Sequence, residues 1–241
     1  MTDRPLRVLA VPVAFNEAGK IGAVLERCRA VSGVDVAVMD DGSTDDTPSI
    51  IAARGVRCLR HDRRRGVGAA IRTAIHAARA AGYDVLVIMA GNDKDRPEEI
   101  ARLVAPIAAG QADIVQGSRY LPGGVFGRMP RHRQWATRWA HPWLVALATG
   151  RRLTDTTNGF RAIRLAIFDD RRINVDQRWL DRYELEPYLL CRAIMLGYRV
   201  VEAPVTKIYP PKALGYTKMA PITGWWRMLR PMLLLGLRLK R

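Results

Sequence analysis

Two adjacent carboxylates close an apolar run near the N-terminal end of the chain. Residues 34–41 read VDVAVMDD, so β-branched and apolar residues lead directly into Asp40 and Asp41. The turn GSTD follows, before a short helical pattern over residues 46–53. This order predicts carboxylates at the carboxyl end of a parallel strand, where they could bind a base or a ribose. The pattern is equally compatible with Asp45 capping the helix while the other two carboxylates are solvated.

The composition suits one globular α/β domain with an anionic partner. The chain has 241 residues, 49% of them hydrophobic, and a net charge of +16. That charge favours nucleic acid, anionic lipid or a phosphate-bearing substrate. No module in which basic and aromatic residues alternate is visible, and we therefore expect no nucleic-acid partner.

Cysteine usage and apolar runs indicate where the protein works. Cys28, Cys58 and Cys191 are widely spaced, which favours core positions in a reducing compartment over disulfides or a metal site. We recognise no signal peptide and no window of about 20 apolar residues. The sequence predicts a cytoplasmic protein, peripheral on the cytosolic face of a membrane if it meets one.

Strands alternate with helices through the first half of the chain. We predict strands at residues 6–13, 34–40, 56–60, 84–89 and 113–116, with helices at 18–31, 46–53, 67–81 and 97–109. A short strand after residue 160, a helix from about 185 and a last strand near 200 follow. This alternation predicts a single α/β domain, with a mostly parallel sheet and helices on both faces.

Two tryptophan-rich helical segments complete the chain. Trp135, Trp139 and Trp143 recur at helical spacing, a pattern more often found in a core than at an interface; the alternative is that the series lines a membrane-facing side. Residues 221–241 pair tryptophans and leucines with arginines, as in an amphipathic helix that lies in a membrane interface. Packing of this helix on the domain is the alternative. We therefore divide the chain into a domain over residues 1–220 and a C-terminal helix over 221–241.

The motifs, in this order, resemble the family 2 glycosyltransferases with a GT-A (Rossmann-like) fold. The branch most similar is the dolichol-phosphate mannosyltransferase-like, or polyprenyl-phosphate sugar transferase, branch, over roughly residues 6–220. The resemblance is carried by VPVAFNE, DDGSTD, RRGVGAAIRTAI, the acidic segment before Pro97, QGSRY and TNGFRA. It implies a nucleotide-sugar pocket that includes Pro12, Asn16, Glu17, Asp40, Asp41, Arg65 and Gly68. In that pocket Asp40 would accept a hydrogen bond from the base.

The chain departs from the family at the acidic D-x-D motif that holds a divalent metal on the donor diphosphate. Its three positions are occupied by Ala90, Gly91 and Asn92. Asp93 and Asp95 follow and could, with Asn92, supply oxygen ligands to Mg²⁺ or Mn²⁺. Alternatively Lys94, with arginines from the C-terminal loop, neutralises the diphosphate without a metal. Both possibilities stay open at this stage.

The acceptor decides whether a general base is needed. A phosphate acceptor is already an anion, whereas a hydroxyl acceptor must lose a proton to a carboxylate. The candidate bases are Asp155 and Glu184 or Glu186, each of which could instead be structural.

Basic residues supply candidate phosphate contacts. The segment with Lys212, Tyr216, Thr217 and Lys218 resembles a family loop in which basic residues close over phosphate; we assign Lys218 a catalytic role there and Lys212 a donor-binding role. Arg119 and Arg161 are further candidates, because a guanidinium fits phosphate oxygens.

The leading hypothesis is an inverting transfer of a sugar from a UDP- or GDP-linked donor to polyprenyl phosphate at the membrane. A soluble glycan or small-molecule acceptor, or a catalytically silent nucleotide-sugar-binding protein, are the alternatives. The sequence does not indicate an oligomeric state.

Overall fold

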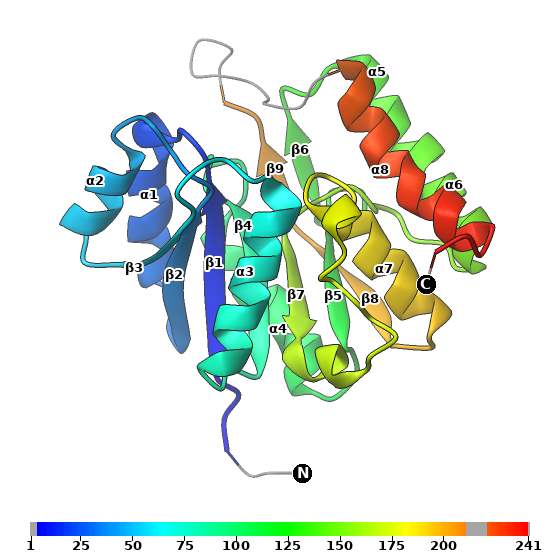
Figure 1. Ribbon diagram of the computed structural model, residues 1–241, viewed down its shortest axis with the longest axis horizontal. Helices are drawn as coiled ribbons and strands as arrows, with labels where there is room; N and C mark the ends of the chain where they lie inside the picture. Colours follow the sequence, from blue (N-terminus) through cyan, green and yellow to red (C-terminus); the bar gives the residue numbers. More distant parts are fainter. Residues whose placement is uncertain (1–3, 211–220, 241) are drawn as a thin grey trace.

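The computed structural model describes residues 4–210 and 221–240, of which the side chains at 221 and 222 are not described. A seven-stranded sheet forms its centre, with the strand order β3-β2-β1-β4-β7-β5-β8 (Figure 1). The strands are β1 (Val8–Ala14), β2 (Val34–Asp40), β3 (Arg57–Arg60), β4 (Val85–Ala90), β5 (Ile114–Ser118), β7 (Arg161–Arg164) and β8 (Val200–Pro204). A second sheet pairs β6 (Val125–Gly127) with β9 (Thr206–Ile208).

The direction of the strands gathers their carboxyl ends at one edge of the sheet. Neighbouring strands run parallel except at β7, which pairs antiparallel with both β4 and β5. The loops after β1, β2, β4 and β5 therefore meet at the edge drawn uppermost in Figure 1. Ligand sites of α/β sheets lie at such an edge.

Helices cover both faces of the sheet because each presents an apolar side to it. One face carries α1 (Ala18–Arg29), α2 (Thr47–Ala53) and α4 (Ile100–Ala108), which share two apolar clusters with the strands. The opposite face carries α3 (Val67–Ala80) and α7 (Leu185–Met195), within the largest cluster (Figure 1). The predicted α/β class is thus confirmed, with a mostly parallel sheet and helices on both faces.

A helical layer beside α7 completes the described part of the chain. It consists of α5 (Arg131–Trp135), a π-helical stretch η2 (Ala136–Ala140), α6 (His141–Thr149) and the C-terminal α8 (Pro221–Gly236). Met232 and Leu235 of α8 are buried in the largest core cluster, so this helix packs on the domain. The remaining elements are short 3₁₀ turns: η1 (Pro97–Glu99), η3 (Leu165–Asp169) and η4 (Arg178–Leu180).

Several local expectations were wrong. The first strand spans Val8–Ala14 where residues 6–13 were predicted, and its pairing with β2 is interrupted between Ala10 and Val13, beside Pro12, which has no N–H to donate. The predicted helix at 97–109 begins as a 3₁₀ turn. Strands β6 and β9 were not expected, because each has three residues and no clear alternation.

The three tryptophans that were expected in the core lie on the surface. Trp135, Trp139 and Trp143 are 64%, 59% and 63% exposed, and Leu147 continues the series. Four-residue spacing drifts around an ordinary α-helix of 3.6 residues per turn. The π-helical stretch between the first and the last tryptophan widens the turn, which keeps the series on one side.

Candidate active site

A cavity of about 430 Å³ opens at the carboxyl edge of the sheet. Its volume is typical of small-molecule sites. Of the sequence-predicted residues, it brings together Asn16, Glu17, Asp41, Asn92, Lys94, Arg119, Arg161 and Glu186. Pro12, Asp40, Arg65, Gly68, Asp93, Asp95, Asp155 and Glu184 are not among its lining residues. Lys212 and Lys218 lie outside the described residues, as does the rest of the expected basic loop.

The acidic turn holds the loop that follows β1. The backbone N–H of Asn16 donates to Ser43 Oγ at 2.8 Å, and Asn16 Oδ1 accepts from the N–H of Thr44 at 2.8 Å. The N–H of Glu17 donates to Thr47 Oγ1 at 2.8 Å. Asn16 has a φ of 51°, a conformation that asparagine tolerates better than most residues. The two loops therefore form one rigid wall of the cavity.

The two adjacent carboxylates have different surroundings. Asp41 reaches the cavity and accepts hydrogen bonds from the N–H groups of Arg65 and Gly66 and from His61 Nδ1, each at 2.8 Å. Asp40 is fully buried, accepts from the N–H of Ser43 and lies 3.2 Å from Arg60 Nε. Asp41 thus fixes the loop after β3, whereas Asp40 stabilises its own turn.

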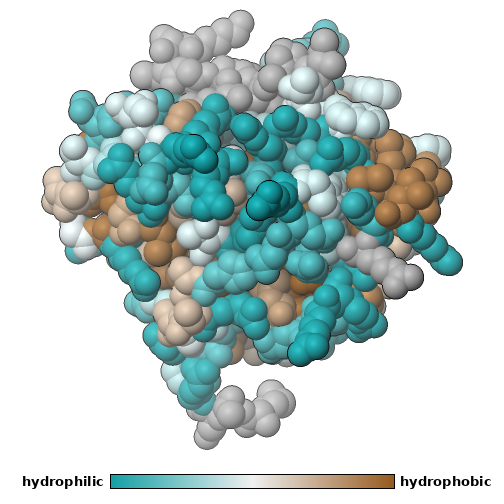
Figure 2. Space-filling model, viewed as in Figure 1, coloured by the Kyte–Doolittle hydropathy of each residue, from teal (hydrophilic) through white to brown (hydrophobic). Residues whose placement is uncertain are grey.

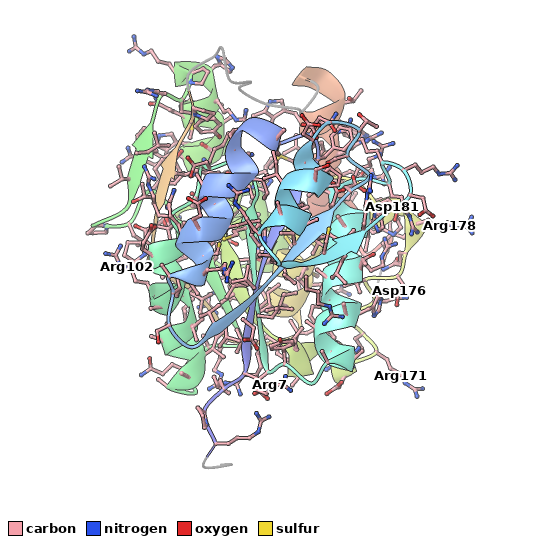
Figure 3. All side chains as sticks on the ribbon, turned by 90° about the vertical axis from the view of Figure 1, so that its left-hand side faces the viewer. Arg7, Arg102, Arg171, Asp176, Arg178 and Asp181 are labelled. Atoms are coloured by element: carbon pink, nitrogen blue, oxygen red, sulfur yellow. The ribbon has the colours of Figure 1, made fainter. Side chains whose placement is uncertain are left out.

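Gly68 is required by close packing at the start of α3. A Cβ at this position would lie 1.9 Å from the carbonyl oxygen of Leu180 and 2.6 Å from that of Arg182. The same loop is bound to α3 by Asp181, whose carbonyl accepts from Ala69 N–H at 3.0 Å. Asp181 is labelled in Figure 3. Gly68 therefore brings the loop at 180–182 to the cavity, to which Arg182 and Tyr183 contribute.

The loop after β4 does not provide a carboxylate set for a divalent metal. Asp93 pairs with Arg27 on α1 at 2.5 Å. Asp95 is fully buried, with Lys207 Nζ 2.5 Å from Oδ1 and the Ala90 N–H 3.0 Å from Oδ2. Asn92 Oδ1 is the oxygen of this loop that is buried at the cavity without a hydrogen-bond partner among the described residues.

One amide oxygen beside an ammonium group does not fit a hard divalent cation, which takes several oxygen ligands. Throughout the described ranges, 4–210 and 221–240, no group of three or more His, Cys, Asp or Glu side chains could hold a metal ion.

Cations dominate this side of the cavity. Lys94 is 7% exposed, and its Nζ lies 4.5 Å from the centre of the Tyr209 ring, which Arg133 also approaches at 5.5 Å. Burial, together with the nearby charges of Lys207 and Arg133, lowers the pKa of Lys94 to about 7. Bound phosphate would favour the charged form of this lysine.

Two arginines that line the cavity, Arg119 and Arg161, each form an ion pair with a carboxylate. Asp155 binds Arg119 in a bidentate pair at 2.6 and 2.8 Å, and the pair is almost fully buried. Burial alone raises the pKa of Asp155, but the charge and hydrogen bonds of Arg119 outweigh it and hold the pKa below its usual range. Arg161 lies 3.1 Å from Glu186, which also lines the cavity.

The candidate bases are therefore placed differently from one another. Glu184 is buried at the start of α7 and pairs with Arg230 of α8 at 3.3 Å, away from the cavity lining. Asp155 has both oxygens bound to Arg119. Of the three candidates, Glu186 lines the cavity, and its carboxylate forms an ion pair with Arg161.

Sequence reasoning missed several lining residues. Arg64 opens the motif RRGVGAAIRTAI but was not singled out, and Arg133, Lys207 and Tyr209 belong to no motif. Lys207 is held at the cavity by its ion pair with Asp95, and Arg133 lies on α5. Among the described lining residues, eight are cationic and three acidic. The cations are Lys20, Arg64, Lys94, Arg119, Arg133, Arg161, Arg182 and Lys207, and the carboxylates are Glu17, Asp41 and Glu186.

The fold places the cavity at the carboxyl edge of the sheet, and comparison with known proteins identifies the family. The model of glycosyl transferase family 2 matches residues 10–172, and the chain belongs to this family. It is a polyprenyl-phosphate mannosyltransferase-like glycosyltransferase. It is 33% identical to undecaprenyl-phosphate mannosyltransferase of Micrococcus luteus, over 89% of this chain and 88% of the relative. Identity to polyprenol monophosphomannose synthase of Mycolicibacterium smegmatis is 31%, over 91% and 83%.

Solved structures support the fold. Glucosyl-3-phosphoglycerate synthase from Mycobacterium tuberculosis, in complex with Mn²⁺, uridine diphosphate and phosphoglyceric acid, superposes with a TM-score of 0.69. The match covers 96% of this chain and 78% of the other at 20% identity. The predicted GT-A architecture is thereby confirmed. That complex contains Mn²⁺. In this chain the described loop after β4 offers a metal only the amide oxygen of Asn92 at the cavity.

Proposed function

We propose that the protein transfers a sugar, with inversion, from a UDP- or GDP-linked donor to a polyprenyl phosphate at a membrane surface. The excess of cationic side chains over carboxylates around one cavity is the observation that carries this proposal. A donor diphosphate and an acceptor phosphate together bring several negative charges into the same space. Such charges are favourable where lysines and arginines are already positioned.

A phosphate acceptor also fits the state of the carboxylates. Asp155 and Glu184 are paired with arginines, and Glu186 lies beside Arg161. A phosphate oxygen is already an anion and needs no base before it attacks the anomeric carbon. The acceptor then needs only to be held in line with the leaving diphosphate, and Arg119 and Arg161 would orient it. A hydroxyl acceptor would need Glu186 as the general base, and Glu186 would first have to break its ion pair with Arg161.

An exposed apolar surface beside the cavity supports a lipid acceptor. We call it the tryptophan face: Trp135, Trp139, Trp143 and Leu147 of α5–α6 with Trp226, Leu233 and Leu237 of α8. Figure 2 shows apolar surface on the right, where α6 and α8 lie in Figure 1. Amphipathic tryptophans with basic neighbours suit the membrane interface. Trp225 and Met228 of α8 line the cavity, so a lipid phosphate could enter while its chain stays on this face.

Membrane contact is proposed as peripheral. No helix among the residues that the structure describes has the length and apolar character to cross a bilayer. Flotation with phosphatidylglycerol vesicles tests the contact, and phosphatidylcholine vesicles report how much of it depends on charge. Binding to neither would remove the membrane from the proposal.

The transfer itself is tested with undecaprenyl phosphate in detergent and a panel of UDP- and GDP-sugars. We expect release of nucleoside diphosphate and a glycosylated lipid phosphate by mass spectrometry. Undecaprenol, which has the same chain without the phosphate, is the matched control and should not react. Equal transfer to undecaprenol, or transfer to a soluble acceptor alone, would overturn the acceptor assignment.

Single substitutions probe the acceptor end. Arg161→Lys keeps the charge but loses the two-pronged guanidinium, and should raise KM for the lipid phosphate more than KM for the donor. Arg152→Lys, an exposed position, is the control and should leave both unchanged.

The absent D-x-D carboxylates favour a second candidate, a nucleotide-sugar-binding protein without turnover. It predicts that nucleotide sugars raise the melting temperature but are neither hydrolysed nor transferred to any acceptor. The transfer assay above distinguishes the two candidates.

A further inference from the structure

The region that the family uses for a metal has a different chemical character here. Ala90 and Asn92 line the cavity at two of the three motif positions, and neither brings a negative charge. The nearest carboxylates are bound elsewhere: Asp93 to Arg27, and Asp95 to Lys207 and a backbone N–H. Recruiting Asp95 to a metal would leave the buried Lys207 ammonium uncompensated, which is costly.

A lysine lies in the same loop at the cavity. Lys94 follows Asn92 by two residues, and both line the cavity. Its backbone carbonyl accepts from the N–H of Ile208 at 3.0 Å, which attaches the loop to β9. The ring of Tyr209 lies against its ammonium group. The charge is therefore built into the wall of the site and does not lie on a free surface chain.

We infer that the Lys94 ammonium replaces the divalent cation, binding the donor diphosphate so that this transferase works without a metal ion. The inference rests on the nucleotide-sugar donor of the proposed function. A lysine is a compact point charge and a common phosphate ligand.

Lys94 would act on the leaving group. As the bond from the anomeric carbon to the diphosphate oxygen breaks, an acceptor phosphate oxygen forms the new bond to that carbon. The leaving nucleoside diphosphate keeps the electron pair and gains one negative charge, while the acceptor phosphate loses one. Lys94 stays protonated, and a fixed cation beside the oxygen that gains charge lowers the barrier.

The electrostatic setting of Lys94 agrees with this role. Burial and the cations Lys207 on β9 and Arg133 on α5 disfavour the charge of Lys94, and Glu17 and Asp95 offset them only in part. A bound diphosphate would supply the negative charge that this group of cations lacks.

Calorimetry of UDP and GDP tests the inference without any acceptor. Wild-type protein should bind its nucleotide with the same affinity, within about twofold, in EDTA and in MnCl₂. Lys94→Gln should lose roughly 10- to 100-fold in both conditions, the range for one charged contact with phosphate. Arg96→Gln removes a positive charge from the same loop, two residues beyond Lys94 and outside the cavity lining, and should bind like wild type.

A converse variant restores the family motif. Ala90→Asp combined with Asn92→Asp and Lys94→Gln should bind nucleotide in MnCl₂ and lose it in EDTA. A melting curve checks that this triple variant folds. If it does not fold, the nucleotide affinity of the single variant Lys94→Gln tests the role of Lys94.

Loss of wild-type binding in EDTA, unchanged affinity of Lys94→Gln, or binding of neither nucleotide would overturn the inference. Metal-independent, Lys94-dependent binding without transfer to lipid phosphate would leave it standing and refute the acceptor assignment instead.

Discussion

The buried pair between Asp155 and Arg119 gives the sharpest prediction for a substitution. Asp155→Asn removes the negative charge and leaves a guanidinium that is 3% exposed without its counter-charge. Breaking one side of a buried pair typically costs about 3–5 kcal/mol. For a chain of this length that corresponds to a fall in melting temperature of roughly 6–20 °C.

The assay is urea or thermal unfolding followed by fluorescence, with Glu26→Gln as the control. Glu26 pairs with Arg54 at the surface, and exposed pairs contribute about 0–1 kcal/mol, so its loss should change the midpoint little. The Asp155 variant should also transfer sugar poorly, because Arg119 is no longer held toward the cavity. A melting temperature within about 2 °C of wild type, with normal transfer, would refute this account of the pair.

The pH dependence of the same pair has a defined sign. The pKa of Asp155 is lower in the folded protein than its ordinary value of about 3.9. The stabilisation is therefore fully present above that value, and is lost as the pH falls from it through the folded pKa. The difference between wild type and variant should be constant from about pH 5 to pH 8 and shrink below about pH 4.

Three further predictions follow from the cavity and its surroundings. Gly68→Ala should destabilise by about 1–3 kcal/mol in urea unfolding, because its Cβ would meet the Leu180 carbonyl, whereas Gly19→Ala, with open space around it, should be neutral or slightly stabilising. Trp139→Ala should weaken flotation with anionic vesicles at an unchanged melting temperature; full retention of binding would remove this residue from the membrane contact. Nucleotide-sugar affinity should fall as the pH rises through about 7, where Lys94 loses its charge, and Lys94→Arg should flatten that profile; a flat wild-type profile would contradict it.

Much of the architecture was readable because it follows from short-range patterns. Apolar runs of strand length alternate with amphipathic helices, and the acidic turn follows the second strand directly. Parallel strands bring their carboxyl ends to one edge, so the loops that bear Glu17, Asp40 and Asn92 were expected to meet there. Glu17 and Asn92 line the cavity, whereas Asp40 is buried and its neighbour Asp41 lines the cavity instead. The family motifs gave the enzyme class for the same reason, since each motif is a local loop at a strand end.

The surface was less predictable than the core. Spacing placed three tryptophans on one side of a helix, but spacing does not say whether that side meets protein or solvent. The π-helical stretch keeps the tryptophans on one side, and α8 packs against α6 and α7. The tryptophan side chains are therefore exposed to solvent.

Local residue patterns predict the alternating fold, the edge of the sheet that carries the site and the loss of the D-x-D carboxylates. Which of the neighbouring charged groups face the cavity follows from the tertiary structure alone. Asp41 faces it and Asp40 does not; Lys94 faces it, while Asp93 and Asp95 turn to partners 66 and 112 residues away. The direction of a side chain depends on such distant ion pairs and on burial, and neither is encoded in the residues next to it.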